Sequence, residues 1–512
     1  MPILFHNGTI RTLGPSGLVN ELLCDARGYV LAVGGAALDH PFAADALRVD
    51  LEGRTALPGP VDAHVHLLWN AQNDLWQADL TGSRSVDEVC ERLRIHGAGR
   101  PDGWLMGHGF DHELFPTHAF PTKADLDSIA PDRPCLVSRV CYHAIVVNSK
   151  ALELAGLESA SGLLTEERMD PVYDCVPPPT RGQWLEICER AMELAVQGGF
   201  TGAHVLVDTA DEIRALQSLH RQGRLKIRVR IQIPYRLLNN LEGLGLSTGF
   251  GDDWLSIGGV KMFSDGSMGA RTAALTAGYS DDPGNTGELI HTPDELERMC
   301  RAVQQAGCQM VIHAIGDRAM DVTIDAITNA AGETTRSRRH RIEHASIVRP
   351  DQITRLAKTG IVCCIQPQFI VTDFWTVQRL GEERKGWIYP FASMLKAGIR
   401  MSGGTDCPVE RLNAMEAIGR AVTRDAPWRG ADISQGFVPD ECLSVEQAWD
   451  LYTKGSAVSG FQEDCTGTLE PGMACDFIAL DEDPFTGDPR RLETMSPALT
   501  VVGGVVQYRK AE

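Results

Sequence analysis

The stretch ALPGPVDAHVHLL, at residues 56–68, indicates how the middle of the chain folds. Its apolar run is typical of a buried β-strand, and the run ends in a His-x-His pair. Eight strand–helix units over roughly 400 residues predict an α/β fold, namely a (β/α)8 TIM barrel with insertions. The other seven strand-like runs are FTGAHVLVD (200–208), KIRVRIQIP (226–234), WLSIGGVKMFSD (254–265), QMVIHAIG (309–316), HRIEHASIV (340–348), GIVCCIQPQF (360–369) and IRMSGGTDC (399–407).

The two ends of the chain do not follow this alternation. They carry short strand-like runs broken by turns, as in the Asn7-Gly8 hairpin signal and in CDFIAL at 475–480. Because the two ends resemble each other and differ from the middle, we expect them to fold together. Residues 1–55 and 464–512 are therefore predicted to form one composite β-sandwich domain.

The remaining residues, 56–463, are assigned to the barrel. Its longest insertion, at about 70–180, contains the His-rich stretch GHGFDHELFPTHAFP. Long loops on a rigid scaffold commonly carry function. We therefore predict that this insertion covers the active site.

Composition and charge exclude several classes of function. The 48 basic and 68 acidic residues give a net charge of −20, and an acidic surface repels nucleic acid. None of the 14 cysteines forms a Cys-x-x-Cys pair, which favours free thiols in a reducing compartment. The N-terminal sequence MPILFHNGTIRTLG does not resemble a signal peptide, and no apolar run approaches the ~20 residues of a membrane span. We expect a soluble cytoplasmic protein without a membrane partner, and a homodimer is a hypothesis only.

Several residues that could bind a metal lie at the ends of predicted strands. His64 and His66 are two apart on a strand, so their side chains point the same way. His313 ends QMVIH, His344 ends RIEH, and Asp406 follows IRMSGGT. Barrel enzymes place their active sites at this carboxyl end, and adjacent imidazoles suit a divalent metal. The shared position favours a metal site over three separate structural roles.

Lys261 lies in SIGGVKMFSDG, a strand whose other residues are mostly apolar or small. A lysine directed into a barrel interior must lose its charge, pair with an anion or be modified. Carboxylation by CO₂ would make it an anionic oxygen ligand able to bridge two cations. The sequence leaves open an ion pair between Lys261 and Asp265, and likewise a pair between His344 and Glu343.

The motifs PGPVDAHVHL, GGVKMFSDGSMGARTA, VIHAIGDRA, RIEHAS and SGGTDCPVE together resemble the amidohydrolase superfamily. The block KMFSDGSMGARTA is similar to the amidohydrolase-3 branch, which includes N-substituted formamide deformylases. The resemblance spans nearly the whole chain, because GTLEPGMACDFIALDEDPF is similar to the segment that closes the family's composite β-sandwich.

The resemblance implies a site with two divalent metals, most simply two zinc ions per chain. The first-strand histidines and the last-strand aspartate would hold one metal, and the histidines of strands five and six the other. The fourth-strand lysine would bridge them as a carbamate. These ligands correspond to His64, His66, Asp406, His313, His344 and Lys261 in turn.

The implied activity is hydrolysis of a non-peptide C–N bond in an amide, an N-substituted formamide or a cyclic amide, by a metal-activated hydroxide. Asp406 would be the catalytic acid–base group that moves a proton to the departing amine. Two alternatives stay open: a deaminase with a single metal, in which Lys261 remains an amine, and a non-catalytic scaffold. The neighbourhood HAIGDRAMD lacks a His-x-x-Glu arrangement, and all six ligands are present, so the C–N hydrolase is favoured.

The substrate is expected to be a small amide-type molecule whose identity the sequence does not settle. The segment GLESASGLLTEERMD, at 156–170, is shorter than the glycine-rich stretch expected for the branch, and this region shapes the pocket. His143, Asp265 and Arg271 are predicted to contact the substrate.

Overall fold

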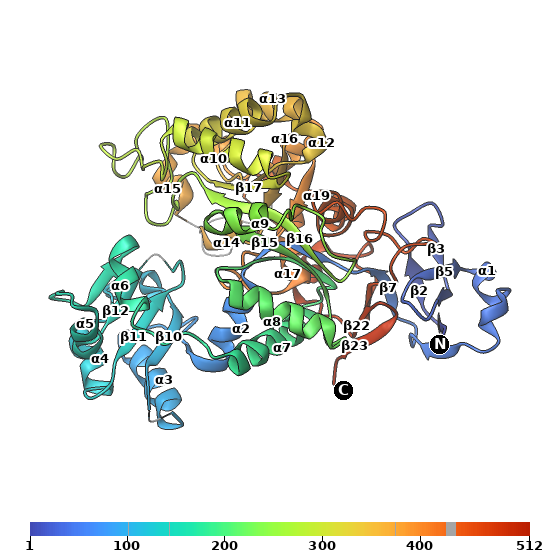
Figure 1. The fold of residues 1–512 in the computed structure, drawn as a ribbon, viewed down its shortest axis with the longest axis horizontal. Helices are drawn as coiled ribbons and strands as arrows, with labels where there is room; N and C mark the ends of the chain where they lie inside the picture. The colour runs from blue at the N-terminus through green and yellow to red at the C-terminus, as the bar shows by residue number, and fades with distance from the viewer. Residues whose placement is uncertain (101, 143, 374, 426–436, 512) are drawn as a thin grey trace. The chain divides into compact units, whose positions relative to one another are not determined.

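The computed structural model describes residues 1–511 apart from 101, 143, 374 and 426–436 (Figure 1). The described residues form two compact units. One consists of residues 1–67 and 192–512, and the other of residues 68–191.

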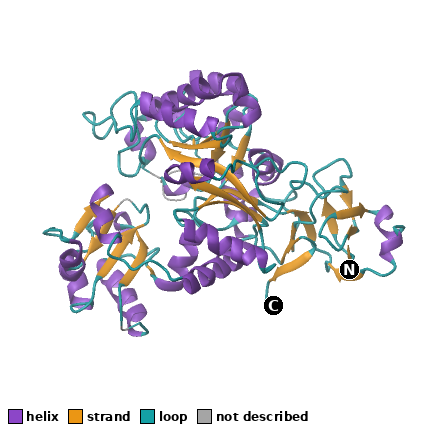
Figure 2. Ribbon diagram, viewed as in Figure 1, coloured by secondary structure: helices purple, strands orange, loops and turns teal. Residues whose placement is uncertain are grey.

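An eight-stranded parallel sheet forms the centre of the first unit (Figure 2). Each strand lies beside the next one along the chain, and each lies within one of the strand-like runs quoted above. The predicted barrel is therefore confirmed. The strands are β8 (Val61–Val65), β14 (Gly202–Leu206), β15 (Arg228–Pro234), β16 (Leu255–Phe263), β17 (Gln309–Ala314), β18 (Arg341–His344), β19 (Val362–Ile365) and β20 (Met401–Gly403).

Hydrogen bonds between β8 and the residues that follow β20 close this sheet into a barrel. The Asp406 N–H donates to the carbonyl of His64 at 2.8 Å, and the His66 N–H donates to the carbonyl of Cys407 at 2.9 Å. The backbones that carry three of the candidate ligands are thus joined directly.

Helices lie between successive strands along the chain. The longer ones are α8 (Ala210–Arg221), α10 (Pro293–Gln305), α11 (Asp317–Ala331), α13 (Pro350–Thr359) and α17 (Ala414–Thr423). Helix α10 begins at a capping box formed by Thr292 and Glu295, with Pro293 in its first turn, and it buries Leu296, Cys300 and Val303. Figure 1 shows α10, α11 and α13 beside one another. Shorter helices are α1 (Gly35–Leu38), α9 (Leu238–Gly243), α12 (Thr335–Arg338), α14 (Phe369–Thr372), α15 (Thr376–Leu380), α16 (Phe391–Lys396), α18 (Val445–Asp450) and α19 (Ser456–Ser459).

Two more sheets in the first unit are built from the chain ends, as expected for the β-sandwich. The four-stranded sheet has the order β5 (Val30–Val33), β4 (Leu22–Cys24), β1 (Ile3–His6), β6 (Leu47–Asp50). The six-stranded sheet has the order β23 (Val505–Arg509), β22 (Leu499–Val502), β21 (Phe477–Leu480), β7 (Thr55–Pro58), β2 (Thr9–Arg11), β3 (Leu18–Val19). In the six-stranded sheet, β21 pairs antiparallel with β7, so strands from the two chain ends are adjacent. The domain limits given above stay a prediction.

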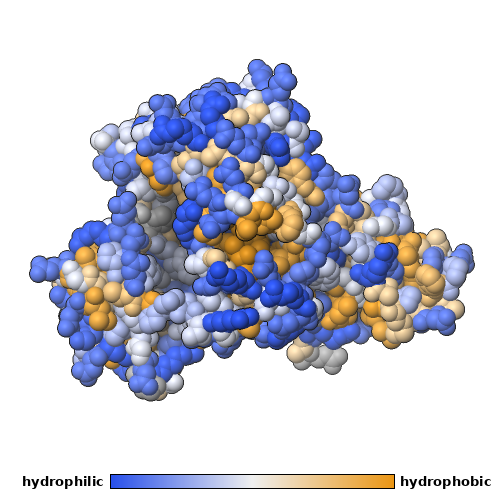
Figure 3. Space-filling model, viewed as in Figure 1, coloured by the Kyte–Doolittle hydropathy of each residue, from blue (hydrophilic) through white to orange (hydrophobic). Residues whose placement is uncertain are grey.

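A shared hydrophobic core includes side chains from both sheets. The rings of Phe5 and Phe477 meet edge to face with their centroids 4.9 Å apart, and both residues are almost fully buried. Apolar side chains also reach the surface of the N-terminal region, as the orange areas on the right of Figure 3 show. Among them, Phe42 is 54% exposed.

The second unit has a mixed five-stranded sheet of its own, in the order β13 (Leu163–Thr165), β12 (Ala144–Val147), β11 (Cys135–Arg139), β10 (Leu105–Phe110), β9 (Ala78–Asp79). Its core includes Leu93, Phe110 and Val137. The predicted insertion therefore has its own sheet and hydrophobic core, while its role as a cover for the active site stays a prediction. The accompanying helices are α2 (Leu67–Trp76), α3 (Val86–Ala98), α4 (Lys123–Ile129), α5 (Ser149–Ala155) and α6 (Asp170–Tyr173), while α7 (Arg181–Gln197) begins in this unit and ends in the first.

Among the helices in the described ranges, none has both the length and the apolar character needed to cross a lipid bilayer.

Replacing Phe477 by alanine should destabilise the protein, because the change removes a buried ring that contacts Phe5 across the shared core. Loss of a buried phenylalanine typically lowers the free energy of unfolding by about 3–5 kcal/mol. Urea titration followed by intrinsic fluorescence measures this change. Phe42→Ala is the matched control and should have little effect, since Phe42 is exposed. Equal stability of the two variants would show that the Phe5–Phe477 contact does not hold the chain ends together.

Candidate metal centre

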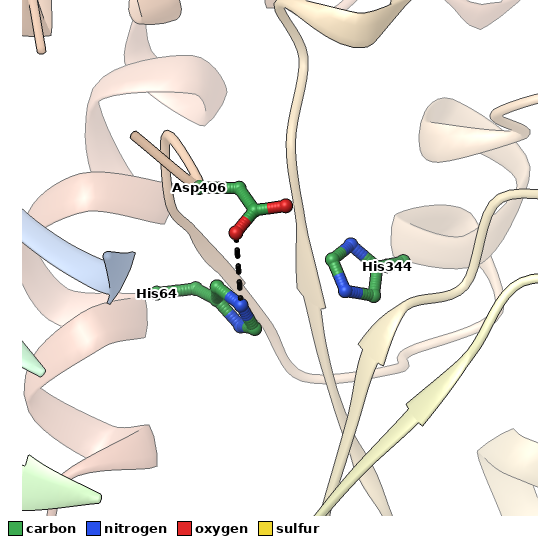
Figure 4. A group of neighbouring side chains, drawn as sticks. All are labelled: His64, His344 and Asp406. Atoms are coloured by element: carbon green, nitrogen blue, oxygen red, sulfur yellow. Dashed lines mark ion pairs between the residues drawn. The ribbon is translucent and has the colours of Figure 1, made fainter. Parts of the chain in front are cut away.

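The candidate ligands lie at the carboxyl ends of the barrel strands. His64 is in β8 and His66 follows it directly. His313 is in β17, His344 ends β18, and Asp406 lies in the segment just after β20. Figure 4 shows His64, His344 and Asp406 around a common space, with an ion pair joining Asp406 and His64.

Distances between these side chains suit a shared metal. Asp406 Oδ1 lies 3.3 Å from His64 Nε2 and 3.4 Å from His66 Nε2. One ligand atom from each of His64, His344 and Asp406 lies within 4.8 Å of the other two. The rings of His313 and His344 are also neighbours, with centroids 4.5 Å apart. The donor set is nitrogen and carboxylate oxygen, which zinc accepts.

In three of the histidines one ring nitrogen is held by a protein acceptor. His344 donates through Nδ1 to Gln366 Oε1 at 2.8 Å, and His313 donates through Nε2 to the Gly266 carbonyl at 3.1 Å. His64 Nδ1 makes a short contact with Glu343. Such contacts orient metal-binding histidines and fix which nitrogen carries the proton. They make the opposite nitrogen of each ring the one that can coordinate a metal.

Burial and nearby charge set the protonation of these rings. Burial lowers the pKa of His344 to about 3, although the carboxylate of Asp406 acts in the opposite direction. Burial, helped by the charges of His344 and Lys261, also holds the pKa of His313 well below its usual range. For His64, burial and Lys261 lower the pKa, but the carboxylates of Asp406 and Glu343 outweigh them and raise it. The His313 and His344 rings are thus neutral, which is the form that binds metals.

Lys261, in β16, is 5% exposed. Burial lowers its pKa to about 8, while the negative charges of Glu343 and Asp406 act against this shift. Within the described part of the chain, Lys261 and Asp265 do not form the ion pair that the sequence left open. The charged groups that act on the pKa of Lys261 are instead Glu343, Asp406 and Arg341.

Asp62 fixes the backbone on which His64 and Asp406 stand. Its Oδ1 accepts the N–H groups of His64 and Thr405, both at 3.0 Å, and its Oδ2 accepts the Thr405 hydroxyl at 2.6 Å. The backbone next to this contact is in the left-handed region at Asp406, with φ of 57°. His344 also lies in that region, with φ of 72°. Such conformations cost on the order of 1–3 kcal/mol each and are typical of functional sites.

Of the three residues predicted to contact substrate, Asp265 and Arg271 are each held by other protein groups. Asp265 is 1% exposed and accepts N–H groups from Ala274, Ile315 and Gly316 at 2.9, 3.0 and 2.8 Å, so it holds two loops together. Arg271 forms an ion pair with Asp281 at 2.7 Å. His143 lies outside the described residues. Substrate contact by these three residues stays a prediction.

Sequence reasoning missed most of the side chains that support the ligands. The sequence offers Glu343 as a partner for His344, whereas in the structure Glu343 contacts His64 and Arg341. The available signal was the alternation in RIEH, which puts Arg341 and Glu343 on one side of a strand. Their partners on β8 and β14 could not be read from that pattern.

Comparison with known proteins identifies the family. Residues 48–508 match the Amidohydrolase family. The chain belongs to the amidohydrolase family. It is 30% identical to the putative amidohydrolase YtcJ of Bacillus subtilis, with 100% of both chains covered. It is 24% identical to the N-substituted formamide deformylase of Arthrobacter pascens, over 99% of this chain and 98% of that protein.

A solved structure extends the similarity to the fold. An uncharacterised metal-dependent hydrolase from Pyrococcus horikoshii is 32% identical and has a TM-score of 0.83, covering 96% of this chain and 99% of the other. This amidohydrolase is thus a hydrolytic enzyme, as the sequence motifs predicted.

Thr405→Val tests whether Asp62 holds the loop that carries Asp406. The change removes the hydroxyl that donates to Asp62 Oδ2 and that accepts the Cys407 N–H at 3.1 Å, and leaving buried polar groups unpaired costs about 1–3 kcal/mol. The free energy of unfolding from a urea titration should fall by that amount. In the control Thr354→Val, the lost hydroxyl donates to the Pro350 carbonyl on an exposed helix turn, and stability should change by less than about 0.5 kcal/mol. A Thr405→Val protein as stable as the control would contradict the assigned role of Asp62.

Proposed function

We propose that this amidohydrolase is a metal-dependent enzyme that cleaves a non-peptide C–N bond in an amide, an N-substituted formamide or a cyclic amide. The observation that carries the proposal is the convergence of His64, His66, His344 and Asp406 at the carboxyl end of the barrel. The similarity to a relative named N-substituted formamide deformylase supports the C–N bond class. The substrate would be a small molecule.

The proposed metal content is two zinc ions per chain. His64, His66 and Asp406 would hold one, and His313 and His344 the other. The orientation of the rings supports this division, because Nε2 of His64 and His66 faces Asp406 while His313 lies against His344. When bound, the ions would polarise the substrate carbonyl and lower the pKa of a water to about 7.

Asp406 is the residue we assign to proton transfer. Its Oδ1 is near His64 and His66, and Figure 4 shows its other carboxylate oxygen turned away from His64. That oxygen would accept a proton from the attacking water and pass it to the nitrogen of the departing amine. The transfer is needed because an amide nitrogen is a poor leaving group as an anion. His64 and its neighbours hold the pKa of Asp406 well below its usual range, overcoming the effect of burial, so the carboxylate begins the reaction ionised.

Lys261 would join the two ions as a carbamate. Its Nζ would form a bond to the carbon of CO₂ and release one proton, which leaves an anion with two oxygen donors. An unmodified ammonium would instead be repelled by both ions, at about 4 kcal/mol per pair of unit charges at 4 Å and an effective dielectric of 20. The buried position of Lys261 among the ligand charges supports this proposal.

Removing the metal should abolish turnover, and adding zinc should restore it. The assay is release of amine from a panel of N-formyl, N-acyl and cyclic amides, with metal content measured by mass spectrometry in parallel.

Asp406→Asn should lower kcat by about 10²–10⁴-fold, since an amide cannot take up the proton. His220→Ala is the control, because His220 pairs with Asp252 on the surface and should be dispensable. Full activity of metal-free protein would disprove the proposal.

Lys261→Ala should lose at least one metal ion per chain and most activity. Short carboxylic acids such as formate or acetate should restore part of both by replacing the missing oxygens. In wild-type protein, ¹³C-labelled bicarbonate should give a carbamate signal in the NMR spectrum that the variant lacks. Lys454→Ala, at an exposed lysine paired with Asp450, is the control and should keep its metal. One metal per chain with no carbamate signal would favour the mononuclear deaminase instead.

A further inference from the structure

A buried ion pair lies inside the barrel beneath the candidate ligands. Arg341 and Glu343 are both 0% exposed, and they are joined by two hydrogen bonds, from Nε to Oε1 at 2.9 Å and from Nη2 to Oε2 at 3.0 Å. Both residues lie on β18, which pairs with β17 and β19. They also form hydrogen bonds with residues of β8 and β14, which are not neighbours of β18. The pair therefore crosses the barrel interior.

The hydrogen bonds of this pair determine where each proton lies. Arg341 can only donate, so His204 Nδ1, at 2.8 Å from Nη1, must accept, and the proton of His204 is on Nε2. Arg341 Nη2 also donates to the carbonyl of Ala63, next to His64, at 2.7 Å. Both carboxylate oxygens of Glu343 accept from the Arg341 guanidinium, the two-bonded arrangement typical of an ionised carboxylate, so Glu343 can only accept. His64 must therefore donate through Nδ1 to Glu343.

We propose that Arg341 and Glu343 are positioning residues that fix the tautomer and ring orientation of His64, so that Nε2 is the nitrogen presented to a metal. This inference rests on the metal centre proposed above. The second nitrogen of His64 contacts the carboxylate of Glu343 directly, whereas His344 uses an amide oxygen and His313 uses the Gly266 carbonyl, with Asp265 Oδ1 farther away at 3.4 Å. A carboxylate partner makes an imidazole a stronger ligand. Arg341 balances the charge of Glu343, so this gain adds no net charge to the barrel interior.

A contribution to stability alone does not require an ion pair at this position. Buried ion pairs can often be replaced by apolar residues of similar size without loss of stability. What an apolar pair could not do is accept the proton of His64 or hold the backbone of Ala63. If the pair only stabilises the fold, removing both charges together should leave zinc affinity unchanged. If the pair positions His64, the same change should weaken zinc binding.

The test is zinc affinity, measured by competition with a coloured chelator, alongside the thermal unfolding midpoint of the metal-free protein. The double variant R341M/E343L removes both charges without leaving either one unpaired. Its zinc affinity should fall by about 10–100-fold, the usual effect of losing the partner of a metal-binding histidine. The isosteric variant Glu343→Gln keeps an oxygen that can accept from His64, so its loss of affinity should be smaller. The thermal unfolding midpoints of the three proteins should not follow the order of their zinc affinities.

The matched control is R228M/D476L. It removes another buried bidentate pair, Arg228 with Asp476 at 2.6 Å, whose residues are 3% and 7% exposed and make no contact with the candidate ligands among the described residues. Its zinc affinity should equal that of the wild type. Unchanged zinc affinity in R341M/E343L, or in Glu343→Gln if the double variant does not fold, would overturn this inference alone. A wild-type protein with no affinity for zinc would overturn the proposed metal centre and this inference with it.

Discussion

The join between the first and last barrel strands is the constraint on which the candidate site depends. Asp62 accepts hydrogen bonds from both sides of this join, and the Asp406 N–H reaches the carbonyl of His64. Residues more than three hundred positions apart are thereby held so that their side chains lie 3.3 Å from each other. The left-handed backbone at Asp406 is tolerated because these bonds restrain it from both sides.

The interior beneath this join is polar, whereas barrels are usually filled with branched apolar side chains. Burying Arg341, Glu343 and His204 is costly unless each finds a partner. The network meets most of this requirement, although His204 Nε2 has no partner among the described residues. Gly460 lies against that nitrogen, where a Cβ would be only 2.7 Å away. The packing therefore leaves no room for a larger side chain there.

The sequence was sufficient for the barrel because most of its strands are buried on both faces, form largely apolar runs and alternate with helical stretches. It was also sufficient to place His64, His313 and His344 at or near the carboxyl ends of their strands. It was not sufficient for the contacts between them. Glu343 meets His64 across the barrel interior, a relation that depends on closure and not on any local pattern. The backbone contacts of Asp265 were unreadable for a similar reason, because they join two loops that are distant in the sequence.

The pairing of β7 with β21 has a consequence for how the chain is made. A ribosome adds about 5–20 residues per second, so β7 is complete on the order of tens of seconds before its partner emerges. Until then the edge of β7 offers unpaired N–H and C=O groups, which invite association with other chains. A nascent chain released before residue 477 would keep that edge open permanently. The arrangement thus makes incomplete products of translation recognisable to the chaperones and proteases of the cell.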